Sequence, residues 1–222
     1  MSFSSKVKEE MAAVIAPSRH CCIAEMAAFI AVSAEVDGGR IVFGGDPDHF
    51  KKKVFTLLRK TYNIERYDES RGLSGAEAAE VLESVHYPEM KGGAVSELLL
   101  KMSCCKRAYL RGFFIAGGSM SDPAKGYHLE MVCNGEEQAS QIKALLEGFD
   151  IKAGSMLRKG HHVVYLKESE AIAEFLSITG AHLCMMDLEN LRIEKGLRSD
   201  VNRRVTVTPQ TLTSLLRRLP DR

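Results

Sequence analysis

The sequence predicts an α+β fold built from two unequal halves related by a pseudo-twofold axis. The first observation is a repeated helix start: Cys21-Cys22 precedes the run AEMAAFIAVSA, and Cys104-Cys105 precedes AYLRGFFIAGGS. The two starts lie 83 to 84 residues apart, which is typical of an internal duplication. The second observation is that both runs are rich in Ala and Gly, so the two helices can approach closely. The third is that strand-like runs follow each helix.

The first half is expected to contain a leading helix, the first repeated helix, a short strand and an amphipathic helix. We expect these elements over 4–15, 19–36, 40–45 and 46–62. Ser4 or Ser5 would cap the leading helix, and Asp46 the amphipathic one. Gly38-Gly39 would end the repeated helix. Between 64 and 101 the pattern is weak, with a helical period only after Ser74, so this half is the shorter one.

The second half has a clearer pattern of helix, strand, helix, two strands and helix. After the second repeated helix, stopped by Gly117-Gly118, we expect a strand over 127–133, a helix over 136–147, strands over 149–158 and 161–167, and helices over 168–180 and 181–198. Lys159-Gly160 has the composition of a hairpin turn between the two strands. Gly180 is placed to end the helix that precedes it.

The composition is that of a soluble globular protein without a membrane segment. The 222 residues are 45% hydrophobic and 27% charged, with a net charge of +1. No apolar run approaches the roughly 20 residues that cross a bilayer, and the N-terminal stretch contains acids, unlike a signal peptide. The six cysteines include two vicinal pairs, which suits a reducing compartment better than a disulfide framework. We therefore expect a cytoplasmic protein with no membrane partner.

The charge is distributed unevenly along the chain. From Leu191 to the C-terminus there are eight basic and three acidic residues, so this segment carries +5 and the rest of the chain −4. A basic segment on an acidic body is typical of nucleic-acid binding, although a solvated helix has the same composition.

Several runs of sequence resemble the LAGLIDADG homing-endonuclease fold and, more closely, the WhiA family of bacterial transcription regulators, which uses that fold without being a nuclease. The runs that carry the resemblance are MSFSSKVKEE, HCCIAEMAAFI, CCKRAYLRGFFIAGGSMSDPAKGYHLEM, VVYLKESEAIAEFLSITGAH and LENLRIEKGLRSDVNRRV. The resemblance spans residues 1–205 and is weak between 64 and 101. It implies a division into an N-terminal helix, a reduced first half, a second half with a C-terminal helix, and a divergent tail, over 1–16, 17–100, 101–205 and 206–222.

The divergent tail departs from the family pattern. Relatives continue into a C-terminal helix-turn-helix, whereas this sequence reads TVTPQTLTSLLRRLPDR from Thr206 to Arg222. One restored base before codon 206 lets the same bases read Asn-Cys-Asp-Thr-Ala-Asn-Ile-Asp-Lys, which follows the pattern of the relatives. We interpret residues 206–222 as a frameshifted ending, either natural or an artefact, so its arginines are not read as DNA contacts.

The resemblance also locates the positions that would carry nuclease chemistry. In the endonucleases an acid near the end of each repeated helix holds a divalent metal, which requires carboxylate oxygens. These positions are Ser33 and Gly117, so no catalytic residue and no catalytic metal are expected. The acids just beyond the helices, Glu35, Asp37 and Asp122, are interpreted as turn residues. The small residues expected at the helix interface are Ala28, Ala34, Gly112, Gly117 and Gly118.

The expected function is DNA-binding transcriptional regulation of sporulation or cell division, with double-stranded DNA as the partner and a nucleoid-associated location. Candidate phosphate contacts are Lys125, Lys152, Arg158, Lys159, Lys167, Arg192, Arg198, Arg203 and Arg204. Their density is modest, so this chain alone should bind DNA weakly. The alternatives are a protein-interaction scaffold without DNA binding of its own and, less favoured, a metal-dependent endonuclease.

The two cysteine doublets do not have the usual spacing of a zinc site. Structural zinc ligands are commonly separated by two to four residues, whereas these thiols are adjacent. His20 precedes Cys21, but neighbours along a helix do not face one another. The sequence therefore favours buried thiols at the start of each helix over the alternative of a zinc site, and we expect neither a metal nor another cofactor.

Overall fold

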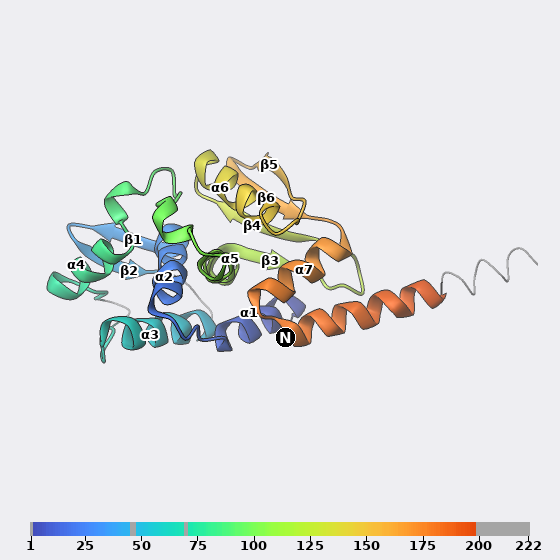
Figure 1. Ribbon diagram of the computed structural model, residues 1–222, viewed down its shortest axis with the longest axis horizontal. Helices are drawn as coiled ribbons and strands as arrows, with labels where there is room; N and C mark the ends of the chain where they lie inside the picture. Colours follow the sequence, from blue (N-terminus) through green and yellow to red (C-terminus); the bar gives the residue numbers. More distant parts are fainter. Residues whose placement is uncertain (1, 45–47, 69–70, 199–222) are drawn as a thin grey trace, which may run out of the picture.

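The computed structural model describes residues 2–44, 48–68 and 71–198. Its centre is a pair of helices, α2 (Arg19–Ser33) and α5 (Ser103–Gly117), which pack against each other along their length (Figure 1). Small side chains permit this close approach: a Cβ atom at Gly112 would stand 2.8 Å from the Glu25 carbonyl oxygen of the facing helix. The α+β class and the two unequal halves around this pair are confirmed.

The first half surrounds α2 with helices and one small hairpin. Helix α1 (Phe3–Ala13) leads into α2, which is followed by β1 (Ala34–Asp37), β2 (Arg40–Phe43), α3 (Asp48–Tyr62), α4 (Gly75–Ser84) and the 3-10 turns η1 (Tyr87–Glu89) and η2 (Glu97–Leu100). Within the described part of this half, β1 and β2 form the whole sheet, so the segment after α3 is helical where the other half has a second hairpin.

Two sequence-based boundaries in this half were wrong. The first repeated helix ends at Ser33 and not at Val36, because residues 34–37 pair with β2 in a hairpin. Gly38 and Gly39 form the turn of that hairpin with φ of +55° and +75°, a left-handed conformation that glycine adopts without strain. The cap of α1 is Ser2, whose Oγ accepts a hydrogen bond from the Ser5 amide at 3.1 Å. The expected cap Asp46 lies outside the described residues.

The second half packs a four-stranded antiparallel sheet against α5. Its elements are β3 (Gly118–Met120), β4 (Leu129–Cys133), α6 (Glu136–Glu147), β5 (Gly154–Arg158), β6 (His161–Leu166), α7 (Ser169–Thr179) and a further helix over 182–198. The strand order is β3-β4-β6-β5. The predicted turn at Lys159-Gly160 is confirmed, with φ of 51° and 82°. Strand β3 was not predicted, because it follows α5 without a break.

The sheet has one buried and one open face. Met131 and Val164 pair across β4 and β6 and contribute to the core beneath the helices. On the other face Glu130 pairs with Tyr165, and the apolar Val132 and Met156 remain 38% and 39% exposed. The helix over 182–198 extends away from the body of the molecule (Figure 1). No helix in the described ranges is long and apolar enough to cross a membrane.

Candidate functional site

The resemblance places the metal-binding positions of the endonuclease fold at the C-terminal ends of α2 and α5. Ser33 and Gly117 are the last residues of the two helices. The Ser33 hydroxyl donates a hydrogen bond to the Phe29 carbonyl at 2.8 Å, and a Cβ at Gly117 would stand 2.8 Å from the Val32 side chain. Neither position carries a carboxylate, so these helix ends offer no acidic ligand at the positions of the motif.

The neighbouring acids do not replace the missing carboxylates. Glu35 and Asp37 are exposed on β1. Asp122 is exposed in the turn after β3, where its Oδ1 accepts a hydrogen bond from the Ala124 amide at 2.9 Å. Over the described ranges, the one group of three or more potential metal-ligating side chains gathered in space lies elsewhere and contains no acid.

Some of the residues expected at the helix interface lie in the two helices, and the others lie in the strands that follow them. Ala28 and Gly112 face each other, with 3.1 Å between the Ala28 Cβ and a Cβ built on Gly112, and Gly117 abuts α2. Ala34 and Gly118 are not helix-interface residues, because they are the first residues of β1 and β3. The helices are shorter than the small-residue runs suggest, because the strand pairing begins within those runs.

A buried ionic cluster, which we call the charged triad, crosses the helix pair. The triad consists of Glu25 on α2, Lys53 on α3 and Arg111 on α5, with exposed fractions of 0%, 1% and 6%. Arg111 Nε and Nη2 donate to the two Glu25 oxygens at 2.8 and 3.0 Å, and Lys53 Nζ lies 3.1 Å from Glu25 Oε1. Lys53 also donates to the Val14 carbonyl. One carboxylate therefore pairs with cations from two further helices.

Burial lowers the pKa of the Lys53 ammonium, and the adjacent Glu25 carboxylate opposes this shift. The charged triad was not identified from the sequence. The available signal was a charged residue inside each otherwise apolar run, Glu25 in AEMAAFIA and Arg111 in AYLRGFFIA. Such residues are almost never fully buried unless they are paired.

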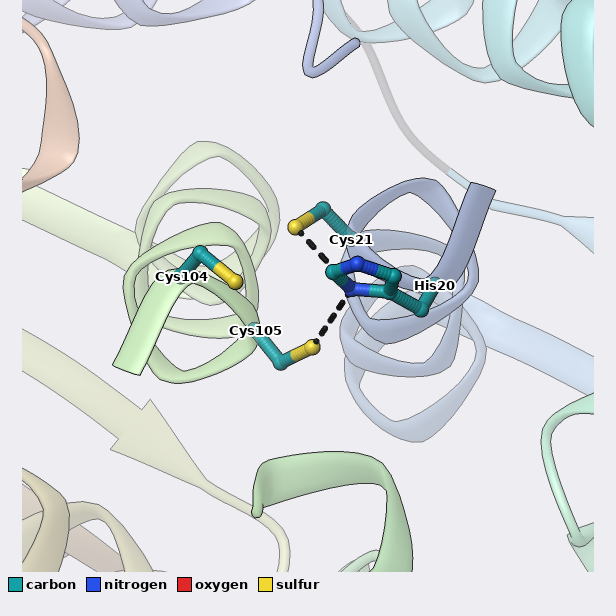
Figure 2. Close-up of side chains that lie close together, drawn as sticks. All are labelled: His20, Cys21, Cys104 and Cys105. Carbon is teal, nitrogen blue, oxygen red and sulfur yellow. Dashed lines mark hydrogen bonds between the residues drawn. The ribbon is translucent and has the colours of Figure 1, made fainter. Parts of the chain in front are cut away.

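At the N-terminal ends of the same helices, four side chains meet to form what we call the thiol cluster: His20, Cys21, Cys104 and Cys105. Figure 2 shows them pointing into the space between the two helix ends. His20 Nδ1 lies 3.1 Å from Cys105 Sγ and 3.3 Å from Cys21 Sγ. All four potential ligand atoms lie within 4.8 Å of one another. The two helix starts, 84 residues apart, are thus brought into contact.

The thiol cluster corrects the interpretation of the doublets. Cys104 and Cys105 are the second and third residues of α5, and the equivalent residues of α2 are His20 and Cys21. Cys22 belongs to another environment, with its thiol directed to the Ala16 carbonyl at 3.5 Å. The expectation that His20 and Cys21 do not face one another was wrong, because in the first helical turn both side chains reach toward the partner helix (Figure 2).

The electrostatics of the thiol cluster favour neutral thiols when no cation is present. Burial raises the pKa of Cys21 to about 12, and hydrogen bonding with Cys104 adds to the shift. Burial also raises the pKa of Cys105, and the neighbouring Cys104 contributes. Cys21 and Cys104 line an adjoining cavity of about 530 Å³ that Arg107 and His182 also line. A solute can therefore reach the cluster from this side.

The predicted DNA-contacting residues of the second half fall at opposite ends of the sheet. Lys152 and Lys167 flank β5 and β6 at the end where Tyr165 pairs with Gly154, and Lys125 lies in the β3–β4 loop at the same end. Arg158 and Lys159 lie at the other end, in the β5–β6 hairpin. These five side chains are all exposed.

Several of these basic side chains already have partners. Arg158 Nη1 lies 3.2 Å from Glu130 Oε2 on the open face, and Lys167 lies over the Tyr165 ring at 4.7 Å. Arg192 pairs with Glu189 and Glu170 at 2.6 and 2.9 Å, and Arg198 with Glu194 at 3.7 Å. Arg203 and Arg204, like the tail over 206–222, lie outside the described residues. Fewer of these side chains are therefore free to contact phosphate than their count suggests.

Two central helices of small residues, each followed by antiparallel strands, define a protein of the LAGLIDADG homing-endonuclease-like class. The crystal structure of I-DmoI in complex with DNA and Mn has this architecture, with a TM-score of 0.53 and 13% identity over 74% of this chain and 99% of I-DmoI. At that identity the similarity establishes the fold alone.

The chain belongs to the WhiA family. The family model described as the WhiA LAGLIDADG-like domain matches residues 106–198. The probable cell division protein WhiA of Lachnoclostridium phytofermentans is 36% identical over an alignment of 249 positions, which covers all of this chain and 80% of that protein. The full-length DUF199/WhiA structure from Thermatoga maritima superposes with a TM-score of 0.74 at 23% identity, covering 96% of this chain and 74% of that one.

Proposed function

We propose that this protein is a DNA-binding regulator of cell division or sporulation that has kept the LAGLIDADG fold and lost its nuclease activity. The proposal is supported by the pair of helix ends, Ser33 and Gly117, which the resemblance places at the acidic positions of the motif. Without carboxylates there, the helix ends lack the ligands that would hold a divalent metal, and it is the metal that would activate water or stabilise a leaving oxygen. Relatives named as cell division proteins, not as enzymes, are consistent with this reading.

The open face of the second-half sheet is the proposed DNA contact. Exposed cations stand at its two ends, with Lys125, Lys152 and Lys167 at one and Arg158 and Lys159 at the other. Phosphate contacts of this kind position a protein on DNA without reading its sequence. Because Glu130 on the same face neutralises Arg158, we propose that this chain binds weakly and that the family's helix-turn-helix supplies recognition.

The test is a titration of this chain with a labelled duplex at several salt concentrations, with Mg²⁺ present. We expect a dissociation constant of about 10⁻⁴ M at physiological salt, tighter binding at low salt, and no cleavage. Cleavage that requires Mg²⁺ would contradict the loss of nuclease activity. An absence of binding at low salt would favour the scaffold function.

Replacing Glu130, the acid that pairs with Arg158 on the open face, should strengthen DNA binding. Glu130→Gln removes the carboxylate that holds Arg158 Nη1 at 3.2 Å and His128 Nε2 at 3.3 Å. One more cation is then free to neutralise phosphate, so the slope of log K against log salt should become steeper by about 0.9. The same titration measures this change. Glu89→Gln, an equal charge change in the first half, is the control, and an identical gain in that variant would exclude a specific role for the open face.

A second candidate function is a protein-interaction scaffold. The helix over 182–198 carries exposed apolar side chains on one face at helical spacing, with 57–70% of each exposed: Leu183, Met186, Ile193 and Leu197. Exposed apolar stripes of this kind mark protein contacts. The two functions separate experimentally, because binding through this stripe would be insensitive to salt whereas DNA binding through the sheet would weaken with it.

A further inference from the structure

We propose that the thiol cluster is a zinc site in which His20 Nδ1 and the sulfurs of Cys21, Cys104 and Cys105 are the four ligands. The site lies at the N-terminal ends of α2 and α5. It is separate from the lost catalytic positions, since Ser33 lies twelve residues after Cys21 along the helix, a rise of about 18 Å.

The geometry is close to that of a tetrahedral site. Bond lengths of about 2.3 Å to sulfur and about 2.0 Å to nitrogen give ligand–ligand separations of about 3.5–3.8 Å in a tetrahedron. The two N···S distances of 3.1 and 3.3 Å are already near that value, and all four atoms lie within 4.8 Å of one another. Separations of up to 4.8 Å must shorten by about 1 Å to reach the tetrahedral value.

The ligand types select the metal. Three thiols and one imidazole make a Cys₃His set, one of the common structural zinc sets, whereas magnesium and calcium require oxygen ligands. The adjacency of Cys104 and Cys105 is not an obstacle, because the other two ligands come from a second helix that meets α5 at its first turn. Burial keeps these thiols neutral when no cation is present, and the positive ends of both helices oppose that effect once a metal binds the thiolates.

The position of the site indicates a structural role. The ligands come from one helix of each half, so a bound zinc ion would join the two halves at the start of the helix pair (Figure 2). Metal can enter through the adjoining cavity lined by Cys21 and Cys104, and the exposed edge of His20 borders solvent. A zinc ion there would raise the stability of the paired helices, since binding to the folded state alone stabilises it.

The first test uses the full chain, reduced and freed of metal by a chelator, and titrated with Co²⁺ and then with Zn²⁺. We expect one equivalent of Co²⁺ to produce the visible absorption of tetrahedral cobalt and a near-ultraviolet thiolate-to-cobalt band, and one equivalent of Zn²⁺ to abolish both. The midpoint of thermal unfolding should rise with Zn²⁺. Binding of less than one equivalent, or the weak spectrum of octahedral cobalt, would overturn the proposal.

Matched variants assign the ligands. Cys104→Ser should weaken zinc binding by at least about 100-fold, because even outer-sphere partners of a metal site contribute 10- to 100-fold. Cys22→Ala is the control, because its thiol points to the Ala16 carbonyl and not into the cluster. Wild-type affinity in Cys104→Ser, or an equal loss in Cys22→Ala, would overturn the assignment.

Thiol protection gives a readout that does not depend on the folding of a variant. In the wild-type chain Cys104 is the half-exposed member of the cluster, so it should react with an alkylating reagent when metal is absent. Zn²⁺ should slow that reaction at least tenfold, as measured by mass spectrometry of the labelled peptides. An unchanged rate, or a disulfide between cluster cysteines that persists in reductant and excludes metal, would overturn the proposal.

Discussion

Glu25→Ala is expected to lower the free energy of unfolding by about 3–5 kcal/mol, the largest effect of any single substitution that we predict. Glu25 is fully buried, and its carboxylate is the shared partner of Arg111 and Lys53. Its removal leaves two cations buried between α2, α3 and α5 without a counter-charge. The loss is much larger than that of an ordinary contact because the desolvation of both cations is then uncompensated. Denaturant titration of the full chain measures it.

Two further variants test whether unpaired buried charge is the cause of the loss. Glu147→Ala removes an exposed partner of Lys143 at 3.9 Å on α6, and it should change the free energy of unfolding by no more than about 0.5 kcal/mol. The triple variant Glu25→Leu, Lys53→Met, Arg111→Leu replaces the charged triad by apolar side chains and should recover most of the stability. If the triple variant is as unstable as Glu25→Ala, unpaired charge is not the cause.

Gly112→Ala is expected to destabilise the helix pair, although alanine is the better helix former. The new Cβ would stand 2.8 Å from the Glu25 carbonyl oxygen and 3.1 Å from the Ala28 Cβ, so the two helices must move apart. Gly196→Ala is the matched control, because Gly196 also lies in a helix and has nothing within 4 Å of its Cβ position. Helix propensity cancels between the two variants, so the difference in unfolding free energy isolates the steric effect.

We expect Gly112→Ala to be less stable than Gly196→Ala by at least about 2 kcal/mol, within the range for overpacked cores. Gly196→Ala itself should gain up to about 1 kcal/mol. Equal stabilities would show that the helices can separate without penalty. Because Gly112 touches Glu25, the substitution also shifts the carboxylate that Arg111 and Lys53 share, and we expect Gly112→Ala and Lys53→Met to be non-additive.

Much of the architecture is determined by local patterns in the sequence. Apolar residues at helical spacing located the helices around 48–62, 136–147 and 169–179. Glycines that tolerate a left-handed backbone marked the turn at Lys159-Gly160 and the end of α7 at Gly180. The absence of acids at Ser33 and Gly117 is a fact of the sequence alone once the repeated helices are aligned. The helices and turns depend on neighbours within a few residues along the chain.

The tertiary structure decided which side chains meet between the helices. The rotation of α2 and α5 about their own axes sets the thiol cluster, and it places His20 opposite Cys105 while directing Cys22 away. The same packing brings Lys53 of α3 to Glu25. Strands β1 and β3 also depend on it, since each continues directly from a helix and is defined by its partner strand. A sequence specifies a helix by its period, but which face of that helix meets another depends on contacts between distant residues, and here those contacts form both the charged triad and the thiol cluster.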